Sequence, residues 1–177
     1  GRFEQSIEIA KKAIAMRVDF GMAQIDAGAD ALTLPDHATG DLVSGEYYRR
    51  YLRDLHIEMV ERLPVPLILH ICGQTLDRMD YIAQTGMAAF HYDSKNPPDE
   101  AMAIVKGRIA LVGNINNPET LFAKGPEEVH EEVCRNLDVG VPLVGPECAI
   151  PLQTPIDNLK EIPKSVKGWW SEQRIPD

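Results

Sequence analysis

A histidine and a cysteine, His70 and Cys72, stand two residues apart at the end of the apolar run 67–71. Side chains at this spacing on an extended strand point to the same side, so an imidazole and a thiol can contact one ion together. That donor pair favours zinc among the common metals, and a third ligand must then come from elsewhere in the chain. Cys148 is the natural candidate, because its loop at 145–151 is rich in Pro and Gly. Buried cysteines are also common core residues, so the spacing alone leaves zinc binding and plain packing both open.

Other polar side chains follow the short apolar runs of the chain in the same way. We expect a cofactor-binding role for four of them, Asp36, His37, Asp93 and Asn114. Each type has a structural alternative, because a carboxylate can cap a helix or orient a metal-bound imidazole, and Asn is an ordinary turn residue.

The remaining thiol and two further histidines receive simpler interpretations. Cys134 shares the 3.6-residue spacing of Val129, Val133 and Leu137, which predicts a core thiol on the inward side of a helix. His56 and His130 fall within predicted helices, and we expect them at the surface or at the boundary between surface and core.

The elements that must position these residues alternate regularly between helix and strand. Helical spacing and stop signals predict helices at 4–27, 44–63, 75–85, 98–105, 126–137 and 157–167. Between them, Ile-, Leu- and Val-rich runs predict strands at 31–34, 67–71, 88–92, 109–112 and 141–144. The runs are continuous rather than alternating, which is typical of parallel strands covered on both faces. The sequence therefore predicts an α/β fold.

Polar residues follow all five predicted strands, and this distribution decides between two architectures. In a (β/α)8 barrel of the TIM type the carboxyl ends of all strands meet at one mouth, whereas an open sheet has its site at a switch point. We therefore expect residues 1–177 to form a single, partial TIM-barrel domain with parallel strands and outer helices. A complete barrel typically needs about 250 residues. Five βα units would leave two open edges, so we expect missing N-terminal sequence, a completing chain or an oligomer.

Composition excludes several partners. The chain has 18 Lys and Arg against 27 Asp and Glu, a formal charge of −9, and no basic run, so nucleic acid is not an expected partner. No apolar stretch approaches the roughly 20 residues of a membrane span, and the start of the sequence lacks a signal-type segment, so we expect no membrane contact and a cytoplasmic location. Three cysteines are an odd number, which argues against a disulfide scaffold.

Three separated motifs carry a resemblance to a known family: HICG at 70–73, GNIN at 113–116 and GPEC at 145–148. With them the chain resembles the uroporphyrinogen decarboxylase-like superfamily, and within it the corrinoid-dependent, methylcobamide:coenzyme M methyltransferase-like branch. The resemblance implies a (β/α)8 barrel, of which this chain corresponds to the C-terminal five βα units. The zinc pattern of that branch, His-x-Cys followed far downstream by Cys, falls on His70, Cys72 and Cys148, which would then be both metal ligands and catalytic residues.

The same resemblance implies an activity and its partners. Members of the branch move a methyl group from a methylated corrinoid, carried by a partner corrinoid protein, to a small-molecule acceptor such as the thiol coenzyme M or tetrahydrofolate. Two alternatives stay open. A uroporphyrinogen decarboxylase-type lyase would need cationic residues around the mouth, and the strand ends show none. A non-catalytic fragment that binds a corrinoid protein would hold zinc without transferring a methyl group.

Overall fold

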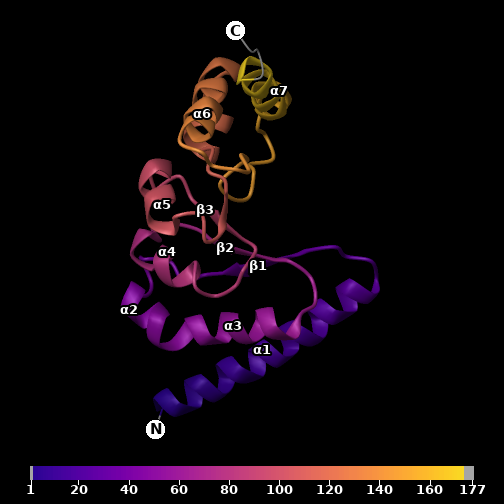
Figure 1. The fold of residues 1–177 in the computed structure, drawn as a ribbon, viewed down its shortest axis with the longest axis vertical. Helices are drawn as coiled ribbons and strands as arrows, with labels where there is room; N and C mark the ends of the chain where they lie inside the picture. Colours follow the sequence, from indigo (N-terminus) through magenta and orange to yellow (C-terminus); the bar gives the residue numbers. More distant parts are fainter. Residues whose placement is uncertain (1, 174–177) are drawn as a thin grey trace.

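Four parallel strands form the centre of the computed structural model, which describes residues 2–173 (Figure 1). They pair in chain order, and their bounds are β1 (Leu32–Asp36), β2 (Leu67–Ile71), β3 (Ala89–Tyr92) and β4 (Ala110–Val112). The predicted α/β class and parallel pairing are therefore confirmed, with strand bounds that differ from the expected ones by at most two residues.

The helices follow the predicted alternation. They are α1 (Arg2–Asp26), α2 (Gly45–Tyr47), α3 (Arg53–Arg62), α4 (Leu76–Ile82), α5 (Pro98–Val105), α6 (Pro126–Asp138) and α7 (Ile156–Gln173), with π-helical turns η1 (Tyr48–Leu52) and η2 (Asn117–Phe122). Figure 1 shows α1 and α3 at the N-terminal end of the molecule, α4 and α5 along one side of the strands, and α6 and α7 at the C-terminal end. Among the described residues, no helix combines the length and the apolar character that crossing a bilayer requires.

The expected fifth strand is incomplete. The segment at 143–147 pairs with the end of β4 and the chain after it only through isolated parallel bridges, Val112 with Leu143 and Ile115 with Pro146. One cause is Gly113, whose φ of +134° takes the backbone out of extended geometry directly after β4. Prolines at 142 and 146 also lack the N–H that a regular ladder needs. The structure therefore shows four regular strands and a fifth segment that continues the sheet irregularly.

The two faces of the sheet differ in burial, although the continuous apolar runs are typical of strands covered on both faces. In register, Leu34, Leu69, Phe90 and Leu111 form a buried row that packs in the main hydrophobic core. The next row along the sheet, Pro35, His70, His91 and Val112, is half-buried or exposed. The reason is that successive side chains of a strand point to opposite faces. His70 therefore lies on the open face.

The predicted helix at 44–63 is not continuous in the structure, and one of its histidines is buried. It is divided into α2, η1 and α3, and His56 on α3 is 2% exposed, so its expected position at the surface or boundary is wrong. Nδ1 of His56 lies 2.8 Å from the hydroxyl of the buried Tyr48, and its Nε2 lies 3.1 Å from Oδ2 of Asp36. Partners on both ring nitrogens allow a histidine to be buried.

A second, smaller core joins α6, α7 and η2. Val129, Val133 and Leu137 of α6 are buried in it, as their spacing predicts. Cys134 is only partly buried and lies at the rim of this core, with its Sγ 3.6 Å from Nε2 of His130. The expected core position of Cys134 is therefore wrong, whereas His130 is exposed as predicted.

Truncation of a side chain in the buried row should destabilise the domain strongly. We expect Leu69→Ala to lower the free energy of unfolding by about 2–5 kcal/mol, because the cavity left at a fully buried site adds to the lost transfer free energy. The matched control is Leu143→Ala, at a leucine that is 52% exposed, with an expected loss below about 1 kcal/mol. Urea denaturation followed by circular dichroism measures both, and equal losses would contradict this assignment of the faces.

Candidate metal centre

Three potential ligands from distant parts of the sequence meet on the open face of the sheet. His70 lies in β2, Cys72 directly follows that strand, and Cys148 follows the irregular fifth segment. Nε2 of His70 is 3.1 Å from Sγ of Cys72, which is 3.0 Å from Sγ of Cys148. All three donor atoms lie within 4.8 Å of one another. The structure therefore brings together the three residues that the sequence selected as metal ligands.

The donor set and its geometry fit a zinc ion. In a tetrahedral zinc site, bond lengths near 2.3 Å to sulfur and 2.0 Å to nitrogen put the donor atoms about 3.5–3.8 Å apart. Because the two short pairs are 3.1 and 3.0 Å apart, their donor atoms would have to separate by about 0.4–0.8 Å to hold the ion. Two thiols and one imidazole are also the soft and borderline donors that zinc prefers. Three protein ligands leave one position for a substrate, as in catalytic rather than structural zinc sites.

The electrostatics of the cluster favour a cation. Burial, the contact with Cys148 and the charges of Asp93 and Glu147 raise the pKa of the Cys72 thiol to about 12. Burial and the neighbouring His91 ring lower the pKa of His70, so its imidazole is neutral at neutral pH. A neutral imidazole is the ligand form of histidine, whereas the thiol must lose its proton to bind a metal. Without a cation the cluster therefore has no positive charge that would stabilise the thiolate form of its cysteines.

The chain after Cys72 is held in place by the neighbouring loops. Gly73 has a φ of +76°, and a Cβ there would lie 2.4 Å from Oγ1 of Thr39, so only glycine fits. Its N–H donates to Oδ2 of Asp93 at 2.8 Å, and its carbonyl accepts from Nδ2 of Asn96 at 2.9 Å. Oδ1 of Asn96 accepts from the N–H of Thr75 at 2.7 Å. These contacts fix the turn that presents the Cys72 thiol.

Two predicted cofactor-binding residues, Asp93 and Asn114, take part in the hydrogen bonds among these loops. Asp93 accepts from Gly73 through one carboxylate oxygen and from the N–H of Lys95 through the other. Asn114 is buried and donates from Nδ2 to the carbonyl of Asn96 at 2.9 Å. Both side chains therefore connect loops around the cluster, and direct contact with a cofactor stays a prediction for them.

His91 connects the histidine side of the cluster to the loop that carries Cys148. Its ring centroid is 4.5 Å from that of His70, and its Nε2 donates to the carbonyl of Pro146 at 2.7 Å. Because β2 and β3 pair in register at these two residues, the parallel sheet itself sets the ring contact. The backbone two residues before Cys148 is thereby anchored to the sheet.

The two predicted residues after β1 differ in their surroundings. Asp36 accepts hydrogen bonds from Ala38 N–H at 2.9 Å and from His56, and its Oδ2 is 4.0 Å from Nη1 of Arg17. Burial alone would raise the pKa of Asp36, but the bonds from His56 and Ala38 outweigh it and hold the pKa below its usual value. His37 is exposed, and its ring is near enough to affect the pKa of His70. Cofactor contact by Asp36 and by His37 stays a prediction.

Sequence reasoning missed two buried asparagines that support the cluster, Asn96 and Asn117. Asn96 joins the loops after β2 and β3, and Nδ2 of Asn117 donates to the carbonyl of Ala149 at 2.9 Å. Both precede a proline just after a strand, a position that restricts the backbone toward extended conformations. The Asn-Pro pairs at 96–97 after β3 and at 117–118 after β4 were the signal that could have identified them.

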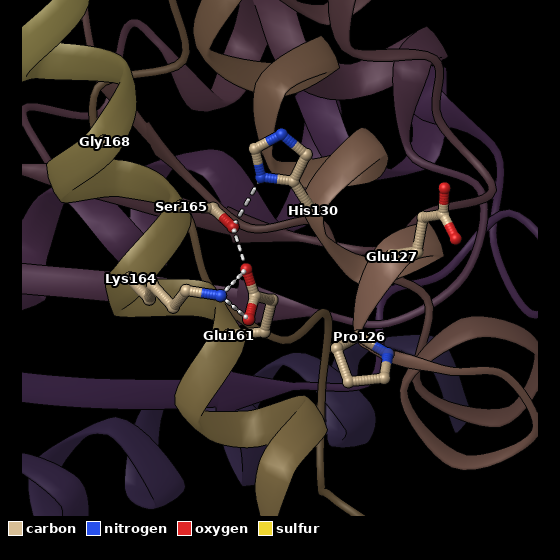
Figure 2. Close-up of a pocket in the computed structure, with 7 residues that line it drawn as sticks. All are labelled: Pro126, Glu127, His130, Glu161, Lys164, Ser165 and Gly168. Carbon is tan, nitrogen blue, oxygen red and sulfur yellow. Dashed lines mark hydrogen bonds and ion pairs between the residues drawn. The ribbon is translucent and has the colours of Figure 1, made fainter.

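Away from the cluster, a cavity of about 430 Å³ lies between α6 and α7, and its lining includes a serine, a histidine and a glutamate (Figure 2). There the Ser165 hydroxyl donates to Oε1 of Glu161 at 3.1 Å, so it accepts from Nδ1 of His130 at 2.9 Å. In a catalytic triad the histidine takes the serine proton instead. This arrangement does not activate the serine and serves to fasten α7 to α6.

Comparison with known proteins identifies a family that the sequence matches and several relatives. The model of a family described as Uroporphyrinogen decarboxylase (URO-D) matches residues 4–169. Methylcobamide:CoM methyltransferase MtbA of Methanosarcina acetivorans is 30% identical over 156 residues, which make up 86% of this chain and 46% of that protein. Uroporphyrinogen decarboxylase of Methylibium petroleiphilum is 32% identical over 182 residues, 95% of this chain and 47% of that protein.

A solved structure shares the fold. A methyltransferase from Methanosarcina mazei superposes with a TM-score of 0.86 at 24% sequence identity, over 89% of this chain and 48% of that one. The chain therefore spans about half the length of the relatives that it matches.

Metal analysis tests the cluster directly. We expect one zinc ion per chain, and an affinity reduced at least ~100-fold in Cys72→Ala and in Cys148→Ala, because each removes one of three ligands. Cys134→Ala is the matched control and should keep the wild-type affinity. Elemental analysis and competition with a chromogenic chelator measure both quantities. Wild-type zinc binding by the two single-ligand variants would contradict the site.

Zinc affinity should also depend on pH. The raised pKa keeps the Cys72 thiol protonated at neutral pH, so metal binding must release that proton, and affinity should rise at least ~10-fold per pH unit between about pH 7 and 8.5. The lowered pKa of His70 adds no proton in this range. Chelator competition at several pH values, corrected for the titration of the chelator, measures the slope, and a pH-independent affinity would argue against thiol ligation.

Proposed function

The chain belongs to the uroporphyrinogen decarboxylase family, and on this basis we propose that it is the zinc-binding part of an enzyme that moves a methyl group from a methylated corrinoid to a thiol. The single observation that carries the proposal is the convergence of His70, Cys72 and Cys148 within 4.8 Å. Similarity to MtbA, whose name states a methylcobamide:CoM methyltransferase, supports the choice of donor and acceptor.

The residues of the chain would act mainly by holding and orienting. His70, Cys72 and Cys148 would hold zinc, which supplies Lewis acidity that favours the deprotonated form of a thiol placed beside it. The cluster is accessible from one side, since the row containing His70 and His91 is only half-buried. The acceptor would approach from that side. Its sulfur forms the new bond to the methyl carbon as the bond between that carbon and cobalt breaks, and the electron pair stays with the corrinoid.

The expected barrel supports this function. With about half the length of its relatives and a sheet that ends at β1, the chain would form the C-terminal part of a (β/α)8 barrel whose other strands complete the mouth. A corrinoid protein would then present its methyl group at that mouth, where positioning of the two reactants dominates the rate. A folate acceptor in place of a thiol is the second acceptor class to test.

A decarboxylase is the rival function, because the family and the relative from Methylibium petroleiphilum carry that name. The thiol and imidazole cluster argues against it. The charged groups that raise the pKa of the Cys72 thiol are the carboxylates of Asp93 and Glu147, so the surroundings of this thiol are acidic, whereas a polycarboxylate substrate needs cationic partners.

A methyl-transfer assay tests the proposal. Zinc-loaded chain, alone and fused behind the N-terminal half of MtbA, is incubated with methylcobalamin and 2-mercaptoethanesulfonate, and demethylation is followed by absorbance. We expect thiol-dependent demethylation that falls at least ~100-fold in Cys72→Ala and Cys148→Ala and persists in Cys134→Ala. Tetrahydrofolate in place of the thiol distinguishes the acceptors.

Three results would contradict the proposal. Demethylation unaffected by both ligand substitutions would exclude the mechanism. Zinc binding without transfer in either form would favour the non-catalytic alternative, and conversion of uroporphyrinogen without bound zinc would favour the decarboxylase.

A further inference from the structure

Cys148 is flanked by Glu147 and Ala149, and both neighbours are tied to the same residue, Asn117. We propose that Glu147 and Asn117 form a positioning clamp that keeps the Cys148 thiol at bonding distance from the cation shared with His70 and Cys72. The inference rests on the zinc site of the proposed function and assigns these two residues a role in it.

Glu147 is committed through both oxygens of its carboxylate. It is 6% exposed; Oε2 accepts from the N–H of Ser94 at 2.8 Å and Oε1 from the N–H of Asn117 at 2.9 Å. A buried carboxylate is costly unless it is hydrogen-bonded, and bonds to a charged acceptor are the stronger kind. The carboxylate therefore fixes the backbone immediately before Cys148 against two loops that follow β3 and β4.

Asn117 holds the other side of the thiol. Its Nδ2 donates to the carbonyl of Ala149 at 2.9 Å, and the side chain is 3% exposed. Its buried Oδ1 has no hydrogen-bond partner within the part of the chain that the structure describes. The amide thus serves the contact with Ala149 alone, which points to a role in holding the loop of Cys148.

The clamp also reaches the loop of the other thiol. Ser94, which donates to Glu147, directly follows Asp93, and Asp93 accepts from the N–H of Gly73 next to Cys72. One dipeptide therefore connects the backbone beside Cys72 with the backbone beside Cys148. This connection accounts for two thiols 76 residues apart in sequence lying 3.0 Å apart.

Positioning and ligation make different predictions for Glu147. If the carboxylate were a fourth ligand, its removal would change the coordination geometry but leave both thiolates on the metal. If it positions Cys148, its removal lets that thiolate leave. Residues that support metal ligands typically change metal affinity 10–100-fold on substitution, roughly.

Cobalt(II) titration of the chain separates the two cases, because thiolate-to-cobalt charge-transfer absorbance reports the number of bound sulfurs. We expect Glu147→Ala and Asn117→Ala to bind cobalt(II) about 10–100-fold more weakly, with absorbance per bound ion falling toward that of Cys148→Ala. Glu147→Gln keeps the shape and one acceptor oxygen and should recover part of the affinity.

The matched control is Glu132→Ala. Glu132 also accepts from a backbone N–H of this region, but its partner is the N–H of Asn116, at 3.0 Å, and not a residue beside Cys148. It should keep the wild-type cobalt(II) spectrum, and an equal loss in Glu132→Ala would overturn the clamp in favour of general loosening.

Undiminished affinity and two-thiolate absorbance in both Glu147→Ala and Asn117→Ala would also overturn the inference. If Glu147→Ala loses its far-ultraviolet circular dichroism, Asn117→Ala, which retains the buried carboxylate, decides. Failure of the wild-type chain to bind cobalt(II) or zinc would instead overturn the metal site of the proposed function and the clamp with it.

Discussion

In-register parallel pairing is the constraint on which the rest of this structure depends. Parallel strands bring their carboxyl ends to one edge, so residues far apart in the chain that follow β2 and the irregular fifth segment meet there. The same register places His70 beside His91, and the hydrogen bond from His91 to Pro146 then ties the Cys148 loop to the sheet. The cluster is a product of strand pairing more than of any local motif.

The alternation of side chains within the strands explains why the cluster is open on one side. One row is buried in the main core, and the neighbouring row, which contains His70 and His91, is half-buried or exposed. A catalytic metal needs this combination, because its ligands require rigid support and its substrate requires access. In a closed barrel the open face would become the lining of the mouth.

Negative charge and buried hydrogen bonds cooperate around the thiols. The carboxylates of Asp93 and Glu147 hold backbone N–H groups in place. At the same time their negative charges disfavour the thiolate form of Cys72 and raise its pKa. A divalent cation resolves this conflict by neutralising the thiolates. The support that fixes the loops therefore also disfavours a free thiolate at Cys72, which favours the proposed cation.

The sequence by itself determined the alternation of helices and parallel strands, because apolar periodicity and Gly and Pro stop signals are local properties. It also determined the candidate ligands, since the His-x-Cys spacing fixes side-chain direction on a strand, the Pro- and Gly-rich loop indicated Cys148 as the third ligand, and the resemblance implied the same three residues. Only the tertiary structure decided that His56 is buried between Tyr48 and Asp36, that the fifth segment pairs irregularly, and that Asn96, Asn117 and Glu147 support the thiols. These outcomes depend on which backbone N–H and carbonyl groups meet across loops, and such contacts leave no periodic pattern in the chain.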